Sequence, residues 1–121
     1  MTTSCEVPSR NDPDELIQLT HVILPDGVAL IAVSGDLDLA TADRTVRYVS
    51  DVIDQHDGPV SVDLSSLAFC DACGLGALIR IAGHAQRTGH WVELARPSEA
   101  LIRIMRITGV DSRLLVPAPA G

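Results

Sequence analysis

Lysine is missing from the sequence, and aromatic side chains are nearly missing. All nine basic residues are arginine, and Tyr48, Phe69 and Trp91 are the three aromatics of the 121-residue chain. Without lysine there is no Walker-type phosphate clamp, no Schiff base and no lysine general base. The chain has few rings that could stack on single-stranded bases, and its net charge of −7 would repel phosphate backbones. We therefore expect neither nucleic acid nor an anionic membrane among its partners.

Long apolar runs are also missing, and cysteine is scarce. No stretch approaches the roughly 18 apolar residues of a membrane-spanning helix. Residues 1–11 lack the basic start and apolar run of a signal peptide. Three cysteines are an odd number in a chain long enough to bury a core, which fits a reducing compartment better than a disulfide framework. The sequence therefore predicts a cytoplasmic protein.

Small aliphatic side chains dominate instead. Ala, Val, Ile and Leu make up 48 residues, in a chain of the length of one ordinary domain. Alternating apolar residues between turn-forming residues predict four strands and a hairpin turn at Pro25-Asp26-Gly27. The predicted strands are 16–23, 28–34, 60–64 and 91–94, with a last short apolar segment at 114–116.

Three helices are indicated by apolar residues at three- and four-residue spacing. Thr41 is expected to cap the first, after a loop at 35–38, and Asp57-Gly58-Pro59 to end it. The second is predicted from Leu75 to about Gly89. The third is predicted from a Ser98 cap to Gly109.

The order of these elements, β-β-α-β-α-β-α, predicts an α/β fold. We expect a single domain with a mixed sheet of four to five strands, covered by helices. The domain is predicted at 14–116, between a flexible N-terminal segment at 1–13 and a flexible C-terminal tail at 117–121.

Several motifs, in their order along the chain, resemble those of one family. They are Gly35-Asp36-Leu37-Asp38, Asp63-Leu64-Ser65-Ser66-Leu67 followed by Phe69 and Asp71, Gly74-Leu75-Gly76-Ala77-Leu78, and Ile107-Thr108-Gly109-Val110. Together they resemble the STAS domain of bacterial anti-sigma factor antagonists, over roughly Leu16 to Val116. The resemblance implies a non-enzymatic STAS-like regulatory module. Such a module binds an anti-sigma factor, a protein kinase-like partner, and so frees a sigma factor. Neither the residues nor the resemblance implies a cofactor or a metal.

The chain departs from the family at the residue through which many members are switched off. In those members the partner phosphorylates a Ser or Thr in a D-S-S-G-type segment. The corresponding segment here is Asp71-Ala72-Cys73-Gly74, so Cys73 occupies the phospho-acceptor position and offers no hydroxyl. Ser65 and Ser66 are near in sequence but do not match that position.

The partner-binding surface is predicted around the start of the second helix. Its residues are Asp36, Asp38, Asp71, Cys73, Gly74 and Leu75. Glycines at a helix start allow another backbone to approach, and the free amides of the first turn carry partial positive charge. Alternative interpretations are that the glycines serve close packing of the helix on the sheet, that Asp71 is a helix cap, and that Asp36 and Asp38 lie in an ordinary solvated turn.

Cys70 and Cys73 form a C-x-x-C pair at the predicted junction of strand and helix. A thiol at a helix N-terminus can have its pKa lowered to about 3.5–7.5, and a turn brings two cysteines within disulfide reach. The alternative function is therefore a thiol-based redox switch or oxidoreductase that uses this pair. The plainer interpretation is a small buried Cys70 and a Cys73 that replaces serine.

Overall fold

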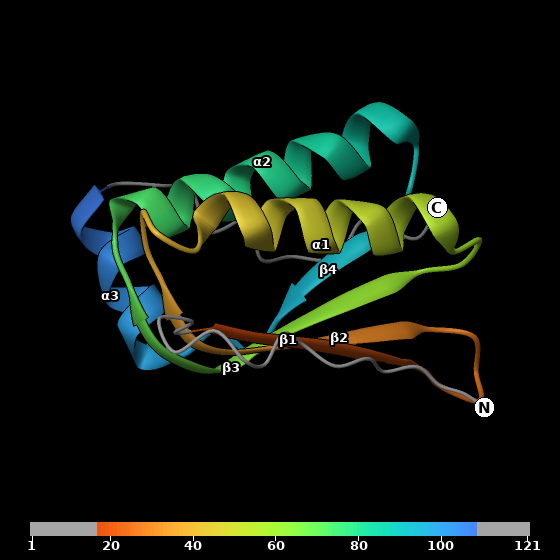
Figure 1. Cartoon of the computed structure of the whole chain (residues 1–121), viewed down its shortest axis with the longest axis horizontal. Coiled ribbons are helices and arrows are strands. Elements are labelled where there is room, and N and C mark those ends of the chain that lie inside the picture. Colours follow the sequence, from red (N-terminus) through yellow and green to blue (C-terminus); the bar gives the residue numbers. More distant parts are fainter. Residues whose placement is uncertain (1–16, 109–121) are drawn as a thin grey trace.

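The structure is a computed structural model, and it describes residues 17–108. Its elements are β1 Ile17–Ile23, β2 Ala29–Leu37, α1 Ala42–Gln55, β3 Val60–Cys70, α2 Ala72–Thr88, β4 Val92–Ala95 and α3 Glu99–Thr108. The four strands form one mixed sheet in the order β1-β2-β3-β4. Figure 1 shows α1 and α2 lying over one face of the sheet, with α3 at one end of it. The predicted α/β class and mixed, helix-covered sheet are confirmed.

The first two strands form the predicted antiparallel hairpin. Burial alternates along them, because Ile17 and Leu19 of β1 and Ile31 and Val33 of β2 point to the helix-covered face and are at most 3% exposed. Gly27 closes the turn at a φ of +91°, in the left-handed region that glycine adopts without strain.

The remaining strand pairs are parallel, and each is joined by a helical crossover. β2 pairs with β3 and β3 with β4, while α1 and α2 form the two connections. Both helices bury their apolar side against the same face of the sheet, in a core that includes Val49, Ile53, Val60, Val62, Leu64, Leu78 and Ile81. Because parallel strands end at the same edge of a sheet, the last residues of β2 and β3 lie at one end of the molecule.

Three strand and helix boundaries differ from the sequence prediction by three or more residues. Residues 35–37, expected in a loop, continue β2 because they pair with residues 67–70, which extend β3 as well. The second helix begins at Ala72, three residues before the predicted Leu75. The glycines at 74 and 76 lower helix propensity, but the Asp71 cap and packing against the sheet outweigh that cost.

The third helix begins at a capping serine and follows an ion pair to the sheet. The Ser98 hydroxyl accepts a hydrogen bond from the Leu101 amide at 3.2 Å, so the predicted cap is confirmed. Arg96, at a φ of +54°, pairs with Asp63 on β3 just before this helix. Leu101 and Met105 are the buried residues of α3. The opposite side of α3 therefore faces outward.

Several predictions concern residues beyond the described range. They are the segments 1–13 and 117–121, the helix end at Gly109 and the apolar segment at 114–116. Within residues 17–108, no helix is both long and apolar enough to span a bilayer.

Candidate functional site

The ends of β2 and β3 meet the starts of α1 and α2 at one end of the molecule (Figure 1). Register shifts between Ala32 and Ser34 and between Gly35 and Asp36 interrupt the β2–β3 ladder. Gly35 has a φ of +111°, so the second shift sits at a position that favours glycine. Beyond it, Asp36 is paired with Phe69, and Leu37 with Cys70. The irregular ladder therefore brings two distant sequence motifs side by side.

Asp38 organises the turn into α1. Its Oδ1 accepts hydrogen bonds from the backbone amides of Ala40 at 3.0 Å and Thr41 at 3.3 Å. Thr41 occupies the N-cap position, but its hydroxyl does not cap the helix; it donates to the Asp36 carbonyl at 2.8 Å instead. The predicted side-chain cap by Thr41 is therefore wrong, because the hydroxyl is used to tie the turn back to β2. Asp38 has a structural role that the sequence interpretation left open.

Asp71 caps α2. Its Oδ1 accepts a hydrogen bond from the Gly74 amide at 2.9 Å, and the Asp71 amide donates to the Leu37 carbonyl. The Leu37 contact joins the start of α2 to the end of β2. Because the helix starts at Ala72, Cys73 lies in its first turn, where its side chain is exposed. The cap therefore presents the Cys73 thiol to solvent.

The two glycines of this turn differ in what surrounds them. A Cβ on Gly74 would clash with the Leu37 carbonyl oxygen and would lie 2.9 Å from the Cys70 Sγ. A Cβ on Gly76 would meet no atom within 4 Å. Gly74 is therefore required for close packing of helix on strand, whereas a side chain at position 76 would meet open space.

We call the solvent-accessible part of this end the strand-end surface, and define it as the exposed Leu39, Phe69 and Cys73 together with the half-buried Asp36 and Asp71. Leu39 is 77% exposed and Phe69 is 48% exposed, which is unusual for large apolar side chains. Sequence reasoning did not single out either as a site residue. Their exposure depends on tertiary packing, which the pattern of apolar residues in the sequence does not show. Gly74 and Leu75, also predicted here, are buried and support the surface from beneath.

Both cysteines of the C-x-x-C pair are free thiols with opposite environments. Cys70 is buried at the end of β3, and its Sγ contacts the Asp71 carbonyl oxygen at 3.6 Å. Burial raises the pKa of the Cys70 thiol to about 11, and the neighbouring Asp71 carboxylate adds to the rise. Cys70 is therefore a poor nucleophile. The redox pair stays a prediction, in which Cys73 would have to be the attacking thiol.

Iodoacetamide at about pH 8 should modify Cys73 much faster than Cys70. With a pKa of about 11, roughly one Cys70 thiol in a thousand is ionised at that pH. Timed peptide mass spectrometry, which resolves Cys5 separately, measures the rates. Equal rates at Cys70 and Cys73 would contradict the structure. Loss of two hydrogens from the peptide that carries both, after mild oxidation, would support the redox hypothesis.

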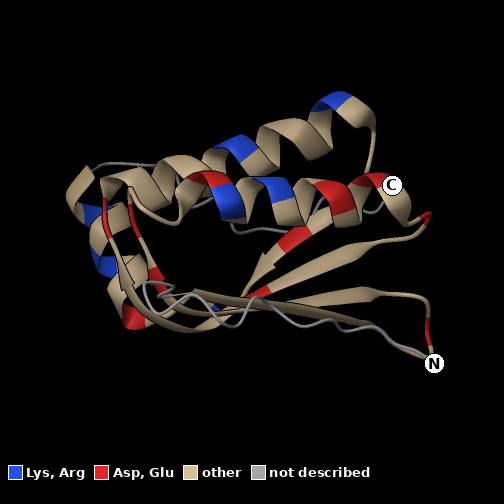
Figure 2. Ribbon diagram, in the orientation of Figure 1, with Lys and Arg blue, Asp and Glu red and all other residues tan. Residues whose placement is uncertain are grey.

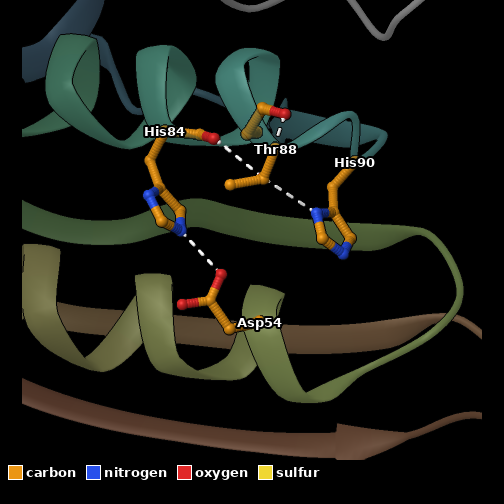
Figure 3. Close-up of polar contacts among 5 residues, drawn as sticks. Asp54, His84, Thr88 and His90 are labelled. Carbon is orange, nitrogen blue, oxygen red and sulfur yellow. Dashed lines mark hydrogen bonds and ion pairs between the residues drawn. The ribbon is translucent and has the colours of Figure 1, made fainter.

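A second polar group lies at the far ends of α1 and α2 (Figure 3). Asp54 Oδ1 contacts His84 Nε2 at 2.8 Å, and Thr88 Oγ1 contacts His90 Nδ1 at 2.8 Å. The Thr88 hydroxyl also lies 2.9 Å from the His84 carbonyl oxygen, to which it donates its only hydrogen. The Asp54–His84 pair therefore does not activate Thr88, and the four side chains do not form a catalytic triad. No group of three metal-ligating side chains occurs within residues 17–108.

Comparison with known proteins supports the family resemblance. A family model described as Mlab, STAS domain, matches residues 21–117. A crystal structure of an anti-sigma factor antagonist from Mycobacterium paratuberculosis is 28% identical, with a TM-score of 0.60 and 84% of each chain covered.

Two more distant structures share the fold. The Bacillus cell fate determinant SpoIIAA in its phosphorylated form is 17% identical, with a TM-score of 0.57 over 76% of this chain and 84% of that one. A sulfate transporter family protein from Wolinella succinogenes is 24% identical, with a TM-score of 0.61 over 76% of this chain and 75% of that one. The family model spans nearly all the described residues, and the chain belongs to the STAS domain family.

Proposed function

We propose that this protein is an anti-sigma factor antagonist. It binds an anti-sigma factor of the protein kinase-like class in the cytoplasm and thereby frees a sigma factor, without catalysing a reaction itself. The similarity to the Mycobacterium antagonist over 84% of the chain supports this role. The single structural observation that carries the proposal is the strand-end surface, where Leu39 is exposed just before α1 and Phe69 just before α2.

The strand-end surface has the properties of a protein interface. Two large apolar side chains supply area to bury. Asp36 supplies a carboxylate that forms no ion pair within residues 17–108. The space that a Cβ on Gly76 would occupy is open, which leaves room for a partner's backbone to approach the first turns of α2. Asp38 and Asp71 hold the two helix starts in place beneath the contact.

Replacing the exposed apolar pair tests the binding surface. Leu39→Ser combined with Phe69→Ser should leave the fold intact, because both side chains are largely outside the core, and should weaken anti-sigma factor binding by about tenfold or more. Val22→Ser is the matched control, since Val22 is 44% exposed but lies on β1. The anti-sigma factor is first identified by co-purification and mass spectrometry, and affinities are then measured by calorimetry. Equal binding by the double variant and the parent would refute this surface.

Control by phosphorylation should be missing at the start of α2. Incubation with the cognate anti-sigma factor and ATP is expected to leave residues 71–76 unmodified, because Cys73 has a thiol where the family's acceptor has a hydroxyl. Intact-protein and peptide mass spectrometry measure the added phosphate. Stoichiometric phosphate on Ser65 or Ser66 would show that the switch has moved to β3.

A further inference from the structure

The outward side of α3 combines basic and apolar side chains. We call Ile102, Arg103, Arg106 and Ile107 the α3 outer face. Ile102 is 39% exposed and Ile107 is 73% exposed, and both arginines are exposed. Ile102, Arg103, Arg106 and the acidic Glu99 line a hollow in the surface. Neither arginine has an acidic partner within residues 17–108.

This face is unusual in an acidic chain. Arg80 pairs with Asp43, Arg96 pairs with Asp63, and Arg44 donates to the Ile17 carbonyl. Arg47 on α1 and Arg87 on α2 have no such partner in the described residues, but neither neighbours a second unpaired arginine on its helix turn. The α3 outer face therefore concentrates the unpaired positive charge beside exposed apolar area. With a net charge of −7, another copy of the chain is repelled from most other directions.

The strand-end surface and the α3 outer face are complementary in charge, and both expose apolar side chains. It carries Asp36 and Asp71 with exposed Leu39 and Phe69, whereas the α3 outer face carries two arginines and two exposed isoleucines beside a single acid, the exposed Glu99. Both lie at the same end of the molecule, because α3 follows β4 and packs against β3 and α2. Figure 2 shows the basic segments of α3 next to acidic segments at the ends of β2 and β3.

We propose that this end of the protein binds the same end of a second copy in a symmetric dimer. A twofold axis makes an interface isologous, so the α3 outer face of each copy meets the strand-end surface of the other. Each opposite-charge contact is then made twice, and the exposed leucine, phenylalanine and isoleucines of both copies are buried together. The occupant of both surfaces is a second copy of this chain.

The dimer regulates the site if the proposed function holds. It covers Leu39, Phe69 and Cys73, so self-association and anti-sigma factor binding exclude each other. Regulation by self-association depends on protein concentration and needs no hydroxyl at position 73. This consequence rests on the proposed function, but the dimer itself does not.

A charge-swap experiment on the full chain tests the interface. Sedimentation velocity across a concentration series should show a monomer–dimer equilibrium that weakens with salt. Arg103→Glu with Arg106→Glu, or separately Asp36→Arg with Leu39→Arg, should each raise the dimer dissociation constant by about tenfold or more. Mixing the two double variants should restore dimerisation, since each heterodimer then pairs opposite charges at both contacts. Arg47→Glu, at an exposed arginine on α1, should change nothing.

Three results would overturn the proposal. They are a parent chain that stays monomeric throughout the series, a dimer that the α3 variant leaves unchanged, and double variants that fail to associate when mixed although circular dichroism shows both are folded. Anti-sigma factor binding by a strictly monomeric parent would remove this inference and leave the proposed function standing. Restored dimerisation in the mixed variants, together with no anti-sigma factor binding by the parent at concentrations where it is monomeric, would keep the dimer and remove the proposed function.

Discussion

Gly74→Ala is expected to destabilise the protein by about 3 kcal/mol or more, or to prevent folding. The added Cβ would clash with the Leu37 carbonyl oxygen and sit 2.9 Å from the Cys70 Sγ. The Leu37 carbonyl belongs to the backbone of β2, so the clash can be relieved only if the strand moves. Overpacking of this kind costs about 1–3 kcal/mol or more. Urea denaturation of the two proteins, monitored by circular dichroism, measures the loss.

Gly76→Ala is the matched control, two residues further along the same helix. Its Cβ would meet nothing within 4 Å, so only helix propensity changes. Alanine is favoured over glycine in a helix interior by up to about 1 kcal/mol, and the variant should be as stable as the parent or more so. Equal destabilisation by both substitutions would contradict this explanation, because helix propensity favours alanine at both positions and only position 74 contacts Leu37.

The different roles of these two glycines could not be predicted from the sequence. Both occur in one motif, and the sequence offered two interpretations for them together, partner approach and helix packing. Three-dimensional contacts separate them: Gly74 serves packing against Leu37, and Gly76 remains open. The distinction depends on β2 extending to Leu37, which sequence periodicity did not predict because Gly35-Asp36 resembles a turn.

Local chemistry was easier to predict than tertiary contact. The caps by Asp71 and Ser98 follow from side chains that reach amides three residues ahead. Thr41 fits the same rule, yet its hydroxyl donates its hydrogen bond to the Asp36 carbonyl. This carbonyl is within reach only because β2 extends beyond its predicted end. Likewise, Leu39 and Phe69 are exposed because no other element within residues 17–108 packs over them. The presence of an apolar residue in the sequence does not reveal whether its side chain is exposed.

A negative charge at position 73 should separate docking from folding. Cys73→Asp is expected to keep the fold, because a carboxylate in the first turn of a helix is favoured by about 0.3–1 kcal/mol. The Cys73 side chain is exposed, so the substitution disturbs no core contact. Anti-sigma factor binding should nevertheless weaken by about tenfold or more, because the interface would have to desolvate an unpaired charge beside Asp71. Thermal melting and calorimetric affinity are measured for the parent and the variant.

Cys73→Ser provides the comparison that assigns the effect to charge. Serine is close to cysteine in size and neutral, so this variant should bind like the parent. It also restores the hydroxyl found at the family's acceptor position. If the anti-sigma factor is an active kinase, the serine variant should gain one phosphate with ATP and then bind as weakly as the aspartate variant, because a phosphate adds about −1.5 to −2 charges at the same place. An aspartate variant that melts normally and binds as tightly as the parent would place Cys73 outside the interface, and would direct attention to Leu39 and Phe69 alone.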